Sequence, residues 1–125
     1  MILQDLILTI DGTLVTKPTD LNRVIKGGFA ADLMSDVLAS IQPEAVLMTG
    51  LCNPQIVRTA QMADIVAIVL VRGKRPQAET IRLADEENVP LVSTPYGMFD
   101  VCGRLHDAGL ASLELPMEND SPDIE

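Results

Sequence analysis

Basic side chains gather in one short segment of an otherwise acidic chain. The segment RGKRP (72–76) holds Arg72, Lys74 and Arg75, three of the nine Lys and Arg residues, whereas eighteen Asp and Glu residues bring the net charge to −9. Guanidinium and ammonium groups bind phosphate and carboxylate oxygens. The cluster therefore indicates a site for a small anionic ligand. A second interpretation, in which these bases are solvated or pair with acids such as Glu79 or with a partner subunit, stays open at this point.

Two further polar turns follow predicted strands in the same way, TGLCNP (49–54) and STPYG (93–97). Ligands of open parallel sheets bind outside the carboxyl ends of the strands, where helix N-termini present free N–H groups. We expect Asn53 to cap a helix that has Pro54 at its first position, and Pro76 to begin the next helix. Ser93 and Thr94 are hydroxyl donors or caps. The candidate ligand-binding residues are Thr49, Gly50, Asn53, Arg72, Gly73, Lys74, Arg75, Ser93 and Thr94.

Residue patterns for catalysis are weakly represented. The sequence lacks GxxxxGK[ST], GxGxxG, GxSxG, HxxxH and CxxC patterns, and its one histidine, His106, is expected on a surface. Cys52 precedes a helix and could be activated there, but a packed thiol is the favoured interpretation. We therefore predict no catalytic residue, no metal and no cofactor, and keep an enzyme that uses Cys52 or a pair of acids as the least favoured class.

Composition favours one α/β domain. Apolar residues make up 47% of the 125 residues and aromatic residues 2%, so the core must be aliphatic, which suits a sheet covered by helices on both faces. The negative charge and scarce aromatic residues argue against binding nucleic acid or an anionic membrane. With no long apolar run and no signal-peptide pattern, we expect a cytoplasmic protein with Cys52 and Cys102 as free thiols.

The end of the sequence differs from the rest. ELPMENDSPDIE (114–125) contains five acids, no base and two prolines. We expect one domain over residues 1–113 and a flexible acidic tail over 114–125. A peptide that docks on a basic partner is the alternative for this tail.

Hydrophobic periodicity predicts the elements that position these turns. A short amphipathic helix over 2–10 comes first, and the predicted strands are 13–16, 23–31, 45–49, 65–71 and 89–94. The other predicted helices are 33–41, with Asp32 as N-cap, 54–63, 76–88 and 97–109. Alternating buried strands and helices predict right-handed crossovers and a three-layer α/β/α domain with a mainly parallel sheet.

Two adjacent glycines interrupt the second of these strands, in NRVIKGGFAADL (22–33). Glycine is kept in a strand where the backbone turns, where φ is positive, or where another backbone or a ligand comes close. We interpret Gly27 and Gly28 as a backbone turn.

The segments NRVIKGGFAADLMSDVLAS, RGKRP and VPLVST, in this order, resemble the DRTGG domain family over about Leu3 to Leu110. In the name-giving motif Arg23, Gly27 and Gly28 match, whereas Asn22 stands where the family has Asp and Lys26 where it has Thr. The resemblance implies a fold like the N-terminal domain of HPr kinase/phosphorylase. It does not imply kinase activity, because the kinase domain and its phosphate loop are missing from this sequence.

The resemblance also implies a role. DRTGG domains accompany other modules, for instance between CBS domains of some inorganic pyrophosphatases and beside phosphotransacetylase, where they look like dimerising or regulatory elements. Some stand-alone copies are encoded near iron hydrogenase components, which suggests hydrogenase-type complexes as partners. The favoured function is a non-catalytic regulatory or interaction module, a homodimer with its glycine turn near the subunit contact, acting on or within a larger complex. The alternative is a sensor of a nucleotide or another phosphorylated metabolite at the strand carboxyl ends.

Overall fold

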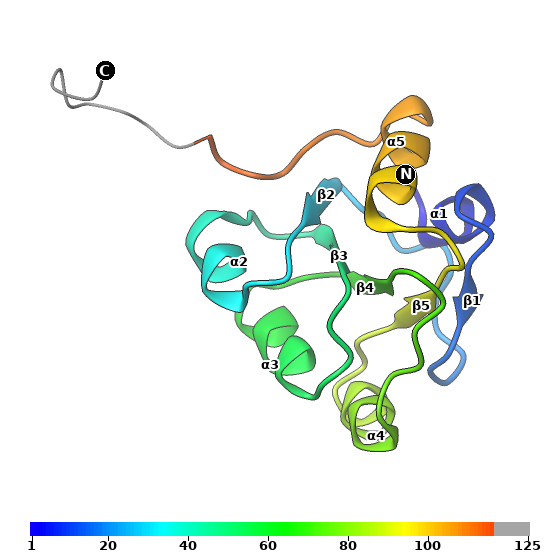
Figure 1. Cartoon of the computed structure of the whole chain (residues 1–125), viewed down its shortest axis with the longest axis vertical. Helices are drawn as coiled ribbons and strands as arrows, with labels where there is room; N and C mark the ends of the chain where they lie inside the picture. Colours follow the sequence, from blue (N-terminus) through cyan, green and yellow to red (C-terminus); the bar gives the residue numbers. More distant parts are fainter. Residues whose placement is uncertain (117–125) are drawn as a thin grey trace, which may run out of the picture.

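The computed structural model of the chain describes residues 1–116. Helices and strands alternate along most of this length (Figure 1). The elements are α1 (Leu3–Thr9), β1 (Thr13–Leu14), β2 (Gly27–Ala30), α2 (Met34–Ser40), β3 (Ala45–Thr49), α3 (Gln55–Met62), β4 (Ala67–Leu70), α4 (Ala78–Glu86), β5 (Leu91–Ser93) and α5 (Met98–Asp107).

The strands form one sheet in the order β1-β5-β4-β3-β2. Strands β2 to β5 are parallel and follow one another in chain order, whereas β1 is antiparallel to β5 at one edge. The prediction of a mainly parallel sheet is confirmed. Because four parallel strands lie side by side, their carboxyl ends meet at one edge of the sheet, which we call the carboxyl edge.

Helices cover both faces of the sheet. Helices α2, α3 and α4 lie on one side, and α1 and α5 on the other (Figure 1). Every residue of β3 is buried, and neighbouring residues face opposite layers. Val46 and Met48 pack in the core with α1 and α5, whereas Leu47 packs in the core with α2, α3 and α4. The three-layer α/β/α prediction is confirmed.

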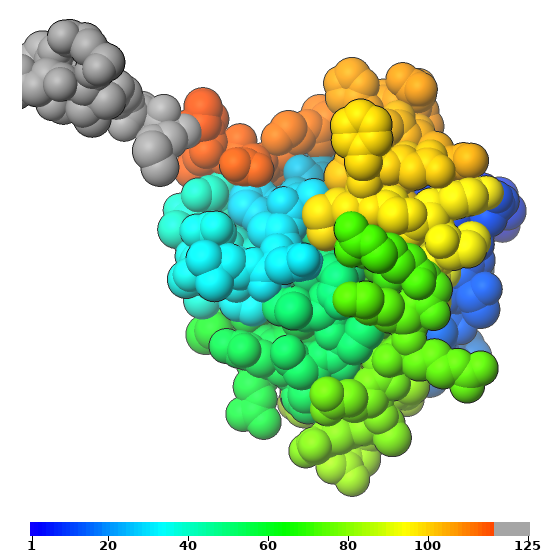
Figure 2. Space-filling model, in the orientation of Figure 1, coloured from blue at the N-terminus to red at the C-terminus, as the bar shows by residue number. Residues whose placement is uncertain are grey.

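The segment after α5 runs along the free edge of β2. The Ala111 carbonyl accepts the Gly28 N–H at 2.8 Å, the Leu113 N–H donates to the Gly28 carbonyl at 2.9 Å, and the Leu115 N–H donates to the Ser40 carbonyl at 3.0 Å. Figure 2 shows this orange segment lying over the cyan residues of β2 and α2. The predicted acidic tail over 114–125 falls mostly on residues 117–125, which lie outside the described residues.

This edge segment explains the glycine pair. Gly27 and Gly28 lie within β2, and neither has a positive φ, so the interpretation as a backbone turn is wrong. A Cβ atom on Gly27 would lie 2.6 Å from the Ala111 carbonyl oxygen and 2.6 Å from Leu113 Cγ. Gly27 is therefore needed for the close approach of another segment of the same chain.

Two predicted helix starts also need correction. α2 begins at Met34 with Leu33 at its N-cap position and without a side-chain cap, so the assignment of Asp32 as N-cap is wrong. α4 begins at Ala78 with Gln77 at the N-cap position, which leaves Pro76 outside the helix.

The start of α3 is closer to the prediction. α3 begins at Gln55, and Pro54 occupies the N-cap position in place of the first helical one. Asn53 Oδ1 accepts the Gln55 N–H at 3.1 Å, as expected for a residue that satisfies a free N–H at a helix start.

Over residues 1–116 the structure contains no helix that is both long enough and apolar enough to cross a membrane.

Candidate functional site

Five residues from three loops meet at the carboxyl edge. Asp32 follows β2, Thr49 and Gly50 lie at the end of β3, and Arg72 and Lys74 follow β4. We call these five residues the carboxyl-edge site. In Figure 2 the bright green residues after β4 lie between the cyan residues near the start of α2 and the yellow residues at the start of α5. The parallel register of β2, β3 and β4 brings the three loops together.

The Asp32 carboxylate is the centre of the hydrogen bonding. Its Oδ1 accepts the Gly50 N–H at 2.7 Å and the Thr49 hydroxyl at 2.9 Å. Thr49 Oγ1 in turn accepts the Leu51 N–H at 3.2 Å. Thr49 and Gly50 are both buried, whereas Asp32 lies at the surface. Two donors fixed by the end of β3 thus point at one oxygen of a carboxylate.

Two cations lie close to Gly50. Lys74 Nζ donates to the Gly50 carbonyl at 3.0 Å. A Cβ atom placed on Gly50 would lie 3.5 Å from Lys74 Nζ, 3.6 Å from Arg72 Nη1 and 3.6 Å from Asp32 Oδ1. Both cations are therefore within a few ångström of Gly50, and the site carries one positive charge in excess of the Asp32 carboxylate.

The surroundings keep Asp32 ionised. The hydrogen bond from the Gly50 N–H is the largest influence and lowers the pKa of Asp32, and partial burial opposes it. The Thr49 hydroxyl, Lys74 and Arg72 lower this pKa further. At neutral pH the site thus contains an anion, Asp32, that accepts hydrogen bonds from an N–H and an O–H group and has two cations nearby.

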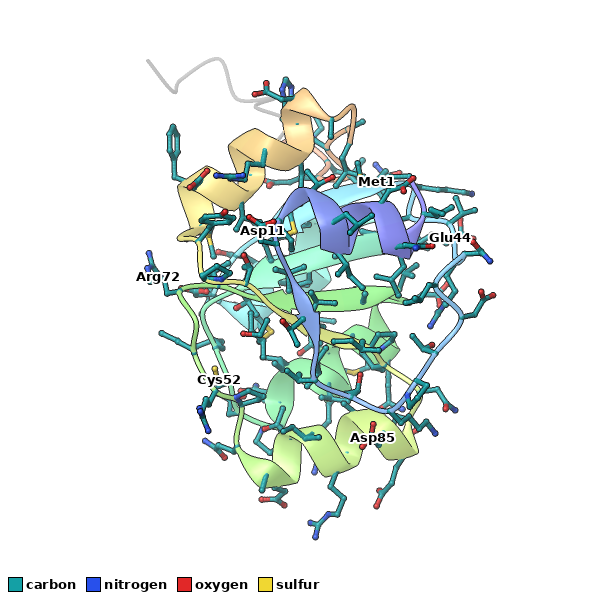
Figure 3. All side chains as sticks on the ribbon, turned by 90° about the vertical axis from the view of Figure 1, so that its right-hand side faces the viewer. Met1, Asp11, Glu44, Cys52, Arg72 and Asp85 are labelled. Atoms are coloured by element: carbon teal, nitrogen blue, oxygen red, sulfur yellow. The ribbon has the colours of Figure 1, made fainter. Side chains whose placement is uncertain are left out.

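The loop after β4 is fixed from the end of β5. Arg72 has a φ of 65° and Gly73 a φ of 61°, a left-handed conformation that is uncommon for arginine. The Arg72 N–H donates to the Tyr96 carbonyl and the Gly73 N–H to the Thr94 carbonyl, both at 2.7 Å. The backbone is therefore held while the Arg72 side chain remains exposed at the left of Figure 3.

Tyr96 is itself tied to neighbouring elements, a role that the sequence did not indicate. Its hydroxyl donates to Asp11 in the α1–β1 turn, and the Arg104 guanidinium lies over its ring with Cζ 3.8 Å from the centroid. Arg104 also bonds Asp100, with 2.9 Å between Nε and Oδ1. The hydrogen bond to Asp11 is the main cause that raises the pKa of Tyr96.

Other predicted ligand-binding residues have structural roles or lie at the rim. Thr94 is buried and donates its hydroxyl to the Ile10 carbonyl at 2.7 Å. Ser93 lies opposite Thr13 in the β1–β5 pair. Arg75 is exposed and forms no salt bridge within residues 1–116. The carboxyl-edge site as defined here therefore leaves out Asn53, Ser93, Thr94, Gly73 and Arg75.

Glu79 does not neutralise the cation cluster. It pairs with Arg82 in the next turn of α4, with 3.8 Å between Nη2 and Oε1. The acid that interacts with the cluster is Asp32, whose pKa Lys74 and Arg72 both lower. β3 pairs with β2 on one side and with β4 on the other, so the loops after these strands come together.

The family-motif residues lie at the opposite end of the sheet. Lys26 precedes β2, its N–H donates to the Glu44 carbonyl at 3.0 Å, and its ammonium group forms a salt bridge with the Glu44 carboxylate. Asn22 is exposed and its N–H donates to Asp20 Oδ1 at 2.9 Å, while the Arg23 carbonyl accepts the Leu3 N–H. Figure 3 shows Glu44 and Arg72 on opposite sides of the molecule. The motif and the carboxyl-edge site are thus two separate regions.

Cys52 adjoins the carboxyl-edge site, with its Sγ 4.0 Å from the Gly50 carbonyl oxygen, and Figure 3 shows it on the same side of the molecule as Arg72. Partial burial raises its pKa, and the nearby Lys74 opposes this effect only in part. Within residues 1–116 no three His, Cys, Asp or Glu side chains are grouped as metal ligands.

The fold and site together define a three-layer α/β domain in which charged side chains from successive loops meet at the carboxyl edge of a parallel sheet. The DRTGG domain model matches residues 5–108 of the sequence, so the chain belongs to the DRTGG domain family. The resemblance found in the sequence is confirmed. No curated protein matches the sequence.

Among solved structures, the chain is similar to the regulatory region of Clostridium perfringens pyrophosphatase, whose crystal structure contains CBS and DRTGG domains in complex with the activator diadenosine tetraphosphate. The TM-score is 0.63 at 13% sequence identity, and the match covers 94% of this chain and 51% of that one. The chain thus spans about half of the regulatory region that it matches, and at this identity the likeness establishes the fold alone.

Proposed function

We propose that this chain is a regulatory domain that senses a small phosphorylated ligand of the nucleotide class at its carboxyl-edge site. The observation that carries the proposal is that the Gly50 N–H and the Thr49 hydroxyl donate to one carboxylate oxygen of Asp32, while Lys74 and Arg72 lie within a few ångström of Gly50. Fixed N–H donors beside Lys and Arg side chains suit phosphate oxygens in the same way.

The solved relative supports the ligand class. Its regulatory region is described in complex with a dinucleoside polyphosphate activator. Adenine nucleotides and diadenosine tetraphosphate are therefore the first ligands to test on this chain, with inorganic polyphosphates as probes of the phosphate contacts alone.

We propose regulation of another protein, and not catalysis, as the output. Burial raises the pKa of Cys52, so the nucleophile that the sequence offered is not activated. We propose that the domain acts on a larger protein or complex, and a hydrogenase-type complex is one proposed partner. The net charge of −9 makes nucleic acid and anionic membranes poor candidates.

A thermal-shift screen against nucleotides tests the proposal. At a ligand concentration about ten times Kd, mass action should add about 1.4 kcal/mol to the free energy of unfolding, or about 5 °C in Tm for a domain of this size. The double variant Arg72→Ala/Lys74→Ala should lose this shift, because both cations beside Gly50 are removed.

The control for this screen is Lys17→Ala/Arg82→Ala, which removes two positive charges at positions away from the site. Lys17 lies in the loop that contacts the carboxyl end of α4, and Arg82 forms only an exposed pair with Glu79. An equal loss of the shift in both double variants would show that net charge, and not the carboxyl-edge site, governs binding. A screen in which no nucleotide or polyphosphate raises Tm would contradict the proposed function.

Self-association is a second candidate function. Phe99 is 93% exposed at the start of α5, and Leu33 is 60% exposed at the start of α2. Contact of large apolar side chains with water is unfavourable, and one of the two Phe residues of the chain is left outside the core. Both helices begin at the carboxyl edge. We place the proposed homodimer contact there and not at Gly28, whose outward backbone groups bond to residues 111 and 113.

Sedimentation velocity tests this second candidate. Phe99→Ser should convert a dimer to a monomer, because it removes the most exposed large apolar side chain of the described residues. Met62→Ser is the control, since Met62 is 69% exposed at the far end of α3. A wild-type chain that sediments as a monomer at all concentrations rules out the homodimer.

A further inference from the structure

Asp32 occupies the donors that an incoming anion needs. The Gly50 N–H is a single donor on a buried residue, and it is already bonded to Asp32 Oδ1 at 2.7 Å. The Thr49 hydroxyl has one proton, and it is directed to the same oxygen at 2.9 Å. A phosphate oxygen at this position would compete for both protons.

Electrostatics leads to the same conflict. A phosphate bound within hydrogen-bond distance of the Gly50 N–H would stand beside the Asp32 carboxylate, which the surrounding donors and cations keep ionised. Two anions in direct contact repel each other. The Asp32 side chain must therefore leave its two donors before a phosphate can take them.

We propose that Asp32 is an internal placeholder, a carboxylate that fills the carboxyl-edge site in the free protein and is displaced by the phosphorylated ligand. The inference rests on the proposed function and adds a regulatory step to it. The placeholder satisfies the buried Gly50 N–H when ligand is absent, which avoids the cost of an unpaired buried donor. It also sets a threshold, because ligand must outcompete an attached group.

Displacement of the Asp32 side chain would transmit ligand binding from the carboxyl-edge site to α2. Asp32 joins β2 to α2, and the residue before it is held by the Ala31 N–H, which donates to the Met48 carbonyl at 3.1 Å. The residue after it, Leu33, is the N-cap residue of α2 and makes no side-chain cap hydrogen bond. Ligand that releases Asp32 thus frees the connection at Asp32 and Leu33 while β2 stays paired, and the exposed Leu33 side chain is the group that changes its surroundings.

Isothermal titration calorimetry with inorganic pyrophosphate, at one low salt concentration and neutral pH, tests the inference. The proteins are wild type, Asp32→Ala and Asp32→Asn, with Asp36→Ala and Asp36→Asn as controls. Asp36 is exposed in the first turn of α2, so its loss changes the net charge near the site without vacating the Gly50 N–H.

We expect Asp32→Ala to bind pyrophosphate about tenfold more tightly than wild type, since a state that was occupied by the placeholder becomes fully available. Asp32→Asn should lie between them, because the amide oxygen can still accept the Gly50 N–H but lacks the charge. The Asp36 variants should change the affinity by less than about threefold, as expected for a screened surface charge.

The placeholder proposal is overturned if wild type binds pyrophosphate and both Asp32 variants bind it more weakly or equally well. The proposed function would then stand, with Asp32 as one of the residues of the binding site. Absence of binding in all five proteins overturns both. An affinity gain in the Asp36 variants as large as that in the Asp32 variants also overturns the placeholder. If Asp32→Ala does not fold by circular dichroism, the affinity of Asp32→Asn decides, because that variant keeps an acceptor for the Gly50 N–H.

Discussion

At the scale of single residues, Gly27 and Gly103 occupy opposite environments. A Cβ atom on Gly27 would meet the Ala111 carbonyl oxygen and Leu113 Cγ at 2.6 Å each, whereas a Cβ atom on Gly103 meets nothing within 4 Å. The backbone oxygen at Ala111 cannot move aside as the tip of a side chain can. Glycine is thus required at position 27, although strand propensity disfavours it there. At position 103, inside α5, no contact requires glycine.

Two alanine substitutions test this difference. Gly27→Ala should lower the free energy of unfolding by about 1–3 kcal/mol, because it forces the segment after α5 away from β2. Gly103→Ala should raise it by about 0.5–1 kcal/mol, because alanine is the better helix former in an exposed helix interior. Urea titrations of both variants give the two values. Equal effects of the two substitutions would show that the contact at Ala111 does not constrain Gly27.

The same scale shows where single-residue interpretation from sequence fails. Asp32 is a good N-cap residue before an apolar periodic segment, and the sequence therefore predicts that role for it. Its actual partners, Thr49 and Gly50, are far along the chain and become neighbours only because β2 pairs with β3. The available signal was that Asp32 directly follows a predicted strand, as Gly50 does, so that both residues had to lie at the same edge of the sheet.

At the scale of elements, the sequence predicted most of the architecture. The run AVLMT forms β3 with the predicted bounds, Ala45–Thr49, because five consecutive apolar or β-branched residues suit a strand buried on both faces. The helices α3, α4 and α5 start within two residues of the predicted positions, since their apolar residues recur with helical spacing. Alternation of the two kinds of element was enough to predict the layers.

The predicted strand over 23–31 shows the limit of such patterns. β2 covers only Gly27–Ala30, and the residues before it are used to contact α1 and Glu44. The edge segment that covers β2 carries no strong strand pattern, and its bonds to Gly28 join residues more than eighty positions apart by number, Gly28 with Ala111 and Leu113. Contacts of this kind depend on the whole fold and leave no local trace except the glycine pair.

At the scale of the whole molecule, the two ends of the sheet differ in chemistry. The amino ends of the strands hold the motif residues, with Lys26 neutralised by Glu44. The carboxyl ends hold Arg72 and Lys74 close to Gly50, whose N–H donates to the Asp32 carboxylate. On a chain with a net charge of −9, the carboxyl edge is therefore where a soluble anion meets cations and fixed N–H donors together.

The glycine amides report on these two ends separately. Gly50 and Gly73 lie at the carboxyl edge, whereas Gly27, Gly28 and Gly109 lie at the start of β2 or beyond the end of α5. Glycine N–H signals fall in a distinct region of a ¹⁵N–¹H correlation spectrum, and the chain has eight glycines, so all can be followed in one titration.

Titration of ¹⁵N-labelled wild-type protein with diadenosine tetraphosphate, and then with pyrophosphate, is the most direct test that this domain senses a phosphorylated ligand at its carboxyl edge. We predict saturable shifts of the Gly50 and Gly73 signals with both ligands, because the Gly50 N–H exchanges the Asp32 carboxylate for a phosphate oxygen. The signals of Gly27, Gly28 and Gly109 should stay in place. Shifts confined to Gly27 and Gly28, or no saturable shift of any glycine, would contradict the account.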